Sequence, residues 1–188
     1  ENFIPRLREG MPIVFTSASC ALAVMKDHPS FFPSEASEKM AASSVYISDY
    51  LVSVLHGTGA RPGALRGSFV YQTPCHAAAI GADEKDIELL SLIPGMEFRG
   101  KTSSCCGMGG TYGLRKENSR ISDSLGRTLA GELASTPADF IISPCGSCRI
   151  MVSNLTAKKA VHPLELLAAA MGVVGLGGSR EPMTSGGQ

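Results

Sequence analysis

Cysteine is the residue type whose spacing in this sequence points most directly to chemistry. Of the six cysteines in the 188-residue chain, five fall in three short segments. These five are Cys75, the adjacent pair Cys105 and Cys106, and Cys145 with Cys148 in a C-x-x-C spacing. Thiolates are soft ligands that suit iron–sulfur clusters, zinc and copper(I), whereas calcium and magnesium prefer oxygen. The C-x-x-C spacing also occurs in redox-active dithiols, so the pattern predicts either a metal site or thiol–disulfide chemistry.

The adjacent cysteines open a glycine-rich segment, CCGMGGTYG. In a regular strand neighbouring side chains point to opposite faces, so both thiols can serve one centre only if the backbone turns sharply, which Gly107 permits. Gly109 and Gly110 leave room for main-chain N–H groups to approach the sulfurs of a cluster. The segment lacks the lysine and serine of a phosphate-binding P-loop, which disfavours nucleotide binding. We therefore interpret it as a loop beside a metal centre.

Two further residues are candidates to contact such a centre without ligating it. His76 follows Cys75 directly, and its position is equally compatible with a hydrogen bond to a cluster sulfur and with a helix-capping role. Cys20 has no neighbouring cysteine, and we interpret it as a small buried hydrophobic residue rather than a ligand. We find no Ser/His/Asp or paired-carboxylate arrangement in a supporting context.

The composition is that of a globular protein, with 44% hydrophobic and 18% charged residues. Seventeen basic residues balance seventeen acidic ones, and the sequence has no Trp, so nucleic acid is disfavoured as a partner. The start of the sequence lacks the features of a signal peptide, and the apolar stretch at 166–178 is shorter than the roughly 20 residues that cross a bilayer. We therefore expect a cytoplasmic protein whose reduced thiols hold a metal.

Short apolar runs alternate with helical patterns along the chain. Strands are expected at residues 11–19, 67–74, 96–98 and 138–143, and helices at 34–57, 76–92, 114–135, 149–155 and from His162-Pro163 onward. The helix at 114–135 presents one apolar face, made of Leu114, Ile121, Leu125, Leu129 and Leu133. Alternating strands and helices predict an α/β fold, a parallel sheet with flanking helices. The cysteine segments follow strands, at the edge where such folds usually carry their sites.

One stretch repeats within the chain. IVFTSASCALAV at 13–24 aligns without gaps on IISPCGSCRIMV at 141–152, which matches Cys20 with Cys148 and Ser17 with Cys145. Such an echo arises either from two similar strand-to-helix junctions or from a duplicated domain that has lost most of its first copy.

Four segments carry a resemblance to a known family. They are YQTPCH at 71–76, CCGMGGTYGLRKEN at 105–118, SPCGSC at 143–148 and HPLELLA at 162–168. This set resembles the cysteine-rich "CCG" domain of iron–sulfur oxidoreductase subunits. The stretch CCGMGGTYGLRKENSRIS is most similar to C subunits of anaerobic glycerol-3-phosphate dehydrogenases. Related members are the iron–sulfur subunits of glycolate oxidase and of lactate utilisation, and the B subunits of heterodisulfide reductases.

The resemblance implies an iron–sulfur electron-transfer subunit. It implies two similar α/β halves, each with one C…CC…CxxC set, and a four-iron cluster, non-cubane in the heterodisulfide reductases, held by five cysteines. Carried over by position, these ligands are Cys75, Cys105, Cys106, Cys145 and Cys148. Electrons would pass from a flavin dehydrogenase subunit for glycerol 3-phosphate or a 2-hydroxy acid toward the membrane quinone pool, with the protein peripheral on the inner membrane face through its partners.

This chain departs from the family pattern in two places. Ser17 stands where the first half would have a cysteine, and Gln72 stands where many relatives have histidine. We therefore expect residues 1–60 to be the tail of an incomplete first repeat, 61–172 to be the CCG domain and 173–188 to be a flexible tail, in a chain that is a fragment or a degenerate copy. Two alternatives stay open: a zinc-binding structural or docking domain, and heterodisulfide-reductase-like thiol–disulfide chemistry.

Overall fold

The computed structural model describes residues 10–156 and 158–173. Its strands are β1 (Ile13–Phe15), β2 (Ser44–Tyr46), β3 (Gly67–Tyr71), β4 (Met96–Lys101), β5 (Phe140–Ile142) and β6 (Ala160–Val161). Its α-helices are α2 (Ala18–Leu22), α3 (His28–Phe31), α4 (Glu35–Ala42), α5 (Ile47–Thr58), α6 (Cys75–Ala79), α7 (Ala82–Ser91), α8 (Ser119–Ser135), α9 (Gly146–Thr156) and α10 (Pro163–Ala170). A π-helical turn η1 (Ala23–Asp27) joins α2 to α3, and two 3₁₀ turns, η2 (Tyr112–Leu114) and η3 (Lys116–Asn118), precede α8.

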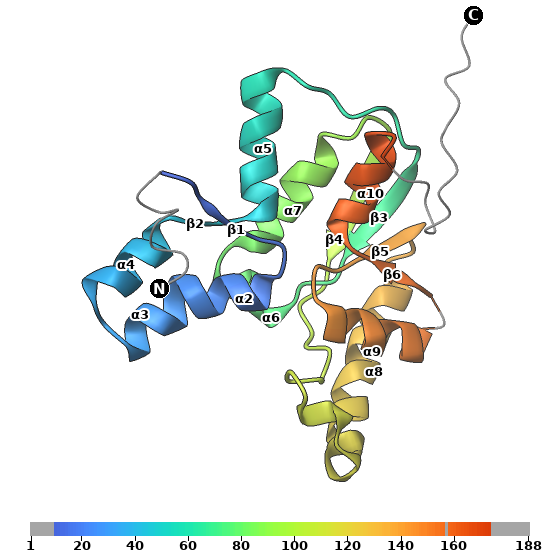
Figure 1. The fold of residues 1–188 in the computed structure, drawn as a ribbon. Coiled ribbons are helices and arrows are strands. Elements are labelled where there is room, and N and C mark those ends of the chain that lie inside the picture. Colours follow the sequence, from blue (N-terminus) through green and yellow to red (C-terminus); the bar gives the residue numbers. More distant parts are fainter. Residues whose placement is uncertain (1–9, 157, 174–188) are drawn as a thin grey trace, which may run out of the picture.

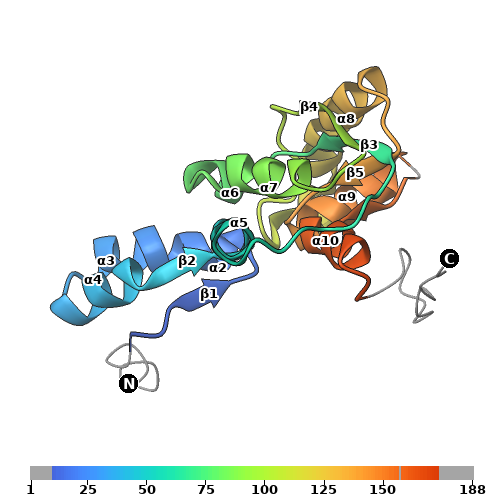
Figure 2. The ribbon, with the colours of Figure 1, turned by 90° about the horizontal axis from the view of Figure 1, so that it is seen from above.

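The fold is α/β, as predicted. Four parallel strands form the larger sheet in the order β4-β3-β5-β6, and β1 pairs with β2 in a separate parallel sheet. Figures 1 and 2 show β1, β2 and α2 to α4 grouped together at one side of the larger sheet. None of the helices within the described residues combines the length and the apolar character needed to cross a bilayer.

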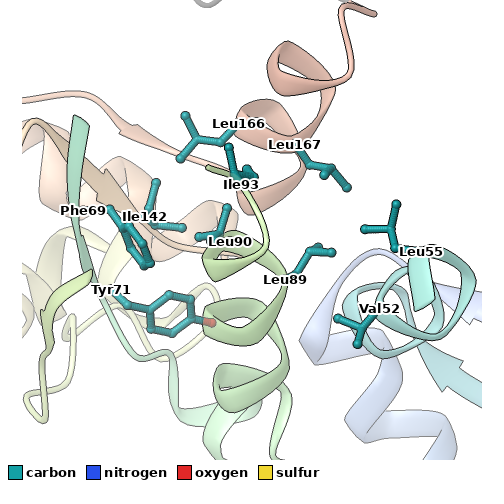
Figure 3. Close-up of a cluster of buried hydrophobic side chains, with 10 residues drawn as sticks. All are labelled: Val52, Leu55, Phe69, Tyr71, Leu89, Leu90, Ile93, Ile142, Leu166 and Leu167. Atoms are coloured by element: carbon teal, nitrogen blue, oxygen red, sulfur yellow. The ribbon is translucent and has the colours of Figure 1, made fainter. Parts of the chain in front are cut away.

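Both faces of the larger sheet are covered by helices, which suits the apolar runs GSFVY and FII of its central strands. Alternate residues of these strands point to opposite sides. Phe69, Tyr71 and Ile142 pack toward the leucines of α7 and α10, and Val52 and Leu55 of α5 extend the same cluster on the far side of α7 (Figure 3). Val70 and Ile141 pack on the other side against α8 and α9.

The predicted helix at 34–57 is wrong in its middle. Ser34 caps α4 through the backbone N–H of Ser37, but the chain then forms β2 before α5 begins. Tyr46 is the reason, because its side chain is buried and its strand pairs with β1, a contact that helical periodicity cannot reveal. The helix also runs past the expected stop at Gly57 and ends before Gly59, which has φ of +70°.

The predicted apolar face at 114–135 is also partly wrong. Leu129 and Leu133 are buried, but Leu114, Ile121 and Leu125 are 65%, 55% and 46% exposed, and Leu114 lies in η2 before the helix. The face that packs inward begins instead with small residues, Ser122 and Gly126. A Cβ at Gly126 would lie 2.6 Å from Leu155 Cδ1, so α8 and α9 approach each other more closely than larger residues would allow.

A buried carboxylate joins the small sheet to the larger one. Asp86 on α7 is fully buried and accepts hydrogen bonds from the hydroxyls of Tyr46 (3.3 Å), Tyr71 (2.6 Å) and Ser48. Burial raises the pKa of Asp86 to about 6, although the three hydroxyls act in the opposite direction. Whether residues 1–60 are the remnant of a first repeat stays a prediction, and all but the first residue of the expected tail at 173–188 lies outside the described residues.

Asp86 should give the protein a distinctive pH dependence. Its folded-state pKa lies above the ordinary value of 3.8, so the folded state binds the proton more tightly and stability falls as pH rises from about 4 to about 6. The shift corresponds to at most about 3 kcal/mol. Urea unfolding across this range should show the decline in the wild type and its loss in Asp86→Asn. Parallel pH profiles for the two proteins would contradict this assignment.

Gly107 fixes the turn that follows the adjacent cysteines. Its φ is +82°, and a Cβ there would collide with the carbonyl oxygen of Ser122. Gly107→Ala should therefore destabilise the protein by about 2 kcal/mol or more. Gly131→Ala is the matched control, because Gly131 lies in α8 with open space around it and should gain roughly 0.5–1 kcal/mol. Equal unfolding free energies for the two variants would show that the turn is not constrained as described.

Candidate metal centre

The strand register brings the three cysteine segments to one edge of the sheet. Tyr71 at the end of β3 pairs with Lys101 at the end of β4 and with Ile142 at the end of β5. Each of these strand ends is followed within a few residues by one cysteine segment. Because the strands are parallel, all three loops leave the sheet in the same direction.

The five predicted ligands line one pocket of about 240 Å³. They come from the start of α6, from the loop after β4, and from the loop and first turn of α9. His76, Gly109 and Gly110 also line this pocket, whereas Gly107 and Cys20 are not among its lining residues. The geometry therefore brings the five thiols together, and their role as ligands stays a prediction.

The pocket has a buried side and an open side. Cys106 and Cys148 are buried in the core between the sheet and helices α8 and α9, and their Sγ atoms lie 3.1 Å apart. Cys145 is half-buried, while Cys75 and Cys105 are exposed. All five are free thiols.

The thiols at the buried side differ in acidity. Hydrogen bonding to the single thiol proton of Cys148, which is directed to Cys106 Sγ, lowers the pKa of Cys106 to about 7 and that of Cys145 to about 6. Backbone N–H groups in the first turn of α9 also lower the pKa of Cys145, as expected for a helix N-terminus. The same hydrogen bonds and burial raise the pKa of Cys148, and burial also raises that of Cys75. The lowered pKa values of Cys106 and Cys145 favour the thiolate, the form that binds metals.

A buried polar pair ties the first and third cysteine loops together. Ser143 Oγ donates to Gln72 Oε1 at 2.8 Å, and both side chains are fully buried. The N–H of Cys145 donates to the same hydroxyl at 3.3 Å, and Arg149 donates to the carbonyl of Ser143 at 2.9 Å. Gln72, which departs from the family pattern, therefore has a structural role: it links the loop before Cys75 to the loop before Cys145.

Glu132 on α8 is a polar residue near the pocket that the sequence analysis did not single out. Its carboxylate accepts hydrogen bonds from Ser103 and Ser104, directly before the adjacent cysteines. Its sequence separation from them is 28 to 29 residues. No signal in a single sequence pairs a half-buried helical glutamate with serines so far away.

The segment of the internal echo contacts the pocket through a residue other than its cysteine. Ser19 on α2 lines the pocket, and its Oγ lies 2.7 Å from Nδ1 of His76. Cys20, which we expected to be buried, is exposed. The reason is that the inward face of α2 is formed by Ala18 and Ala21.

The donor set suits a thiolate-bound inorganic group. Five thiols line the pocket and no carboxylate does, which favours iron or zinc over magnesium or calcium. The thiols share one pocket without forming a ready-made site for a single ion: within residues 10–156 and 158–173, no group of three or more His, Cys, Asp and Glu side chains is arranged to hold a metal ion.

Comparison with known proteins places these residues in context. The family described as "Cysteine-rich domain" (CCG) matches residues 69–153. The C subunit of anaerobic glycerol-3-phosphate dehydrogenase from Escherichia coli (strain K12) is 31% identical over 171 residues, which are 87% of this chain and 41% of that protein. The B subunit of fumarate reductase (CoM/CoB) from Methanothermobacter marburgensis is 27% identical over 183 residues, 90% of this chain and 35% of that protein. Lactate utilization protein A 2 of Bacillus cereus (strain Q1) is 28% identical over 172 residues, 85% of this chain and 70% of that protein.

The chain thus spans less than half the length of the first two relatives, both of which are named as subunits of oxidoreductases. The matched family segment begins in β3 and ends in α9, and it contains all three cysteine loops. Residues 69–153 of this chain therefore match the cysteine-rich CCG domain family.

Proposed function

We propose that this chain is an iron–sulfur electron-transfer component of an oxidoreductase complex. The observation that carries the proposal is the gathering of five free thiols from three distant loops around one pocket. The similarity to two oxidoreductase subunits supports the reaction class. Thiolate-held iron–sulfur clusters transfer single electrons, at potentials set by cluster type, hydrogen bonds and exposure.

The five cysteines of the pocket would hold a four-iron cluster, for which the family resemblance favours a non-cubane form. When bound, this group would supply the capacity to accept and release electrons. The chain's own contribution is to fix the sulfurs and to control access of water. Cys106 and Cys148 sit in the apolar core, with Met108 beside them, whereas Cys75 faces solvent. A cluster here would be shielded on one side and reachable on the other.

The partner proposed for this chain is a flavin-containing dehydrogenase subunit. The sequence offers no catalytic arrangement for hydride transfer, so that chemistry would belong to the flavin. Relatives named for glycerol-3-phosphate dehydrogenase and for lactate utilization support glycerol 3-phosphate or a 2-hydroxy acid as the substrate of the complex. Electrons would continue to membrane quinone, with this chain in the cytoplasm at the inner membrane face through its partners.

Metal analysis tests the proposal directly. Protein expressed and purified without oxygen should be brown and carry about four iron and four acid-labile sulfide per chain, with an EPR signal after oxidation or reduction. About one zinc per chain without sulfide would instead support a structural docking domain. Thiols that titrate freely in metal-free, folded protein would favour dithiol exchange, and either of these results would reject the electron-transfer proposal.

Single substitutions locate the ligands. Cys106→Ser and Cys148→Ser should each lose most of the iron, because a hydroxyl is a poor substitute for a thiolate at a soft metal. Cys20→Ser is the matched control, since Cys20 is outside the pocket, and it should keep the wild-type iron content. Equal iron loss in all three variants, measured with circular dichroism as a check on folding, would contradict this ligand set.

A further inference from the structure

A single carboxylate holds the two residues that precede the adjacent cysteines. Glu132 Oε2 accepts the backbone N–H groups of Ser103 (2.9 Å) and Ser104 (3.2 Å). Oε1 accepts the hydroxyls of the same two residues, at 3.2 Å and 2.5 Å. Every polar hydrogen of the Ser103-Ser104 dipeptide is therefore directed to one side chain.

The loop between β4 and η2 is also held by hydrogen bonds on either side of Ser103 and Ser104. Upstream, the N–H of Thr102 donates to the carbonyl of Tyr71 at 2.9 Å, which fixes the end of β4 to β3. Downstream, the N–H of Gly107 donates to Cys105 Sγ at 3.3 Å, and Cys106 Sγ meets Cys148 Sγ. The loop turns away from the sheet between these points, and Glu132 supplies the contact that spans the turn.

The chemistry of the contact favours an ionised carboxylate. The hydroxyl of Ser104 and the N–H of Ser103 lower the pKa of Glu132. Hydrogen bonds to a charged acceptor are shorter and stronger than those between neutral groups. Glu132 itself projects from α8, which is held against the sheet by the buried residues Leu129 and Leu133. The helix that carries this carboxylate is therefore fixed in the core.

We propose that Glu132 is the positioning residue of the Cys105-Cys106 pair: by holding Ser103 and Ser104 against α8, it sets the place from which both thiols reach the pocket. The inference rests on the proposed function only for the identity of the group that the thiols hold. The clamp itself involves only side chains and backbone of this chain, so it can be measured without a metal.

The chain contains a matched control for this interaction. Asp139 accepts the backbone N–H and the hydroxyl of Ser68, both at 2.8 Å, so its carboxylate forms a similar clamp on a serine. Asp139 precedes β5 and Ser68 lies near the start of β3, so this clamp is at the opposite end of the strands from the cysteines. A substitution there perturbs the same kind of bond without touching the pocket.

Hydrogen exchange of the reduced, metal-free chain is the first measurement. In Glu132→Ala the amides of residues 103–106 should exchange about tenfold faster than in the wild type, while those of β3 and β5 keep their rates. Asp139→Ala should accelerate exchange at Ser68 and leave 103–106 unchanged. Unchanged exchange at 103–106 in Glu132→Ala, or equal acceleration there in Asp139→Ala, would overturn the assignment.

Cluster assembly under anaerobic reconstitution is the second measurement. Glu132→Ala should bind at most half of the wild-type iron or give an altered EPR spectrum. Glu132→Gln should be intermediate because it keeps one acceptor oxygen. Asp139→Ala should match the wild type. If Glu132→Ala does not fold, the Gln variant carries both measurements. A wild-type EPR spectrum and iron content in Glu132→Gln, together with unchanged exchange, would overturn the inference. Wild-type protein that binds no iron would reject the proposed function and leave the exchange result as the test of the clamp.

Discussion

The common register of three parallel strands is the constraint on which the candidate site depends. Tyr71 pairs with Lys101 on one side and with Ile142 on the other, and each of these three residues is the last of its strand. Parallel pairing forces the three chains to leave the sheet at one edge. The pairing of the strands alone therefore brings cysteines that are far apart in the sequence close together in space. The loops need only short additional anchors, which Gln72, Ser143 and Glu132 provide.

The pocket combines two environments that metal centres rarely gain from a single loop. The sulfurs of Cys106 and Cys148 belong to the same apolar cluster as Leu129, Met151 and other core residues, so their positions are set by packing. Cys75 and Cys105 are exposed and face solvent. Solvent exposure and the polarity around the sulfurs are among the factors that set the potential of a cluster. The buried pair is therefore held in place by packing, while the exposed pair forms the side of the pocket that solvent reaches.

Local sequence patterns were sufficient for much of this arrangement, and the failures share one cause. The runs at β3 and β5 and the helix start at His162-Pro163 are visible from residue type alone, and so is the convergence of cysteines at strand ends. The strand at Tyr46 and the exposed positions of Ile121 and Leu125 were missed because long-range packing decides them. The roles of Glu132 and Asp86 were equally hidden, since each depends on partners from other elements.

The buried face of the sheet has a consequence for how this protein can be divided. Residues 69–153 mark the matched family segment, yet residues outside it complete its core: Leu166 and Leu167 of α10 belong to the same cluster as Phe69 and Tyr71, and Val52 and Leu55 of α5 extend that cluster on the far side of α7 (Figure 3). Cutting the matched segment out alone would expose this cluster to solvent and would remove the hydroxyls of Tyr46 and Ser48 from the carboxylate of Asp86. The hydrophobic core is therefore wider than the matched segment, and truncation designs should keep α5 and α10.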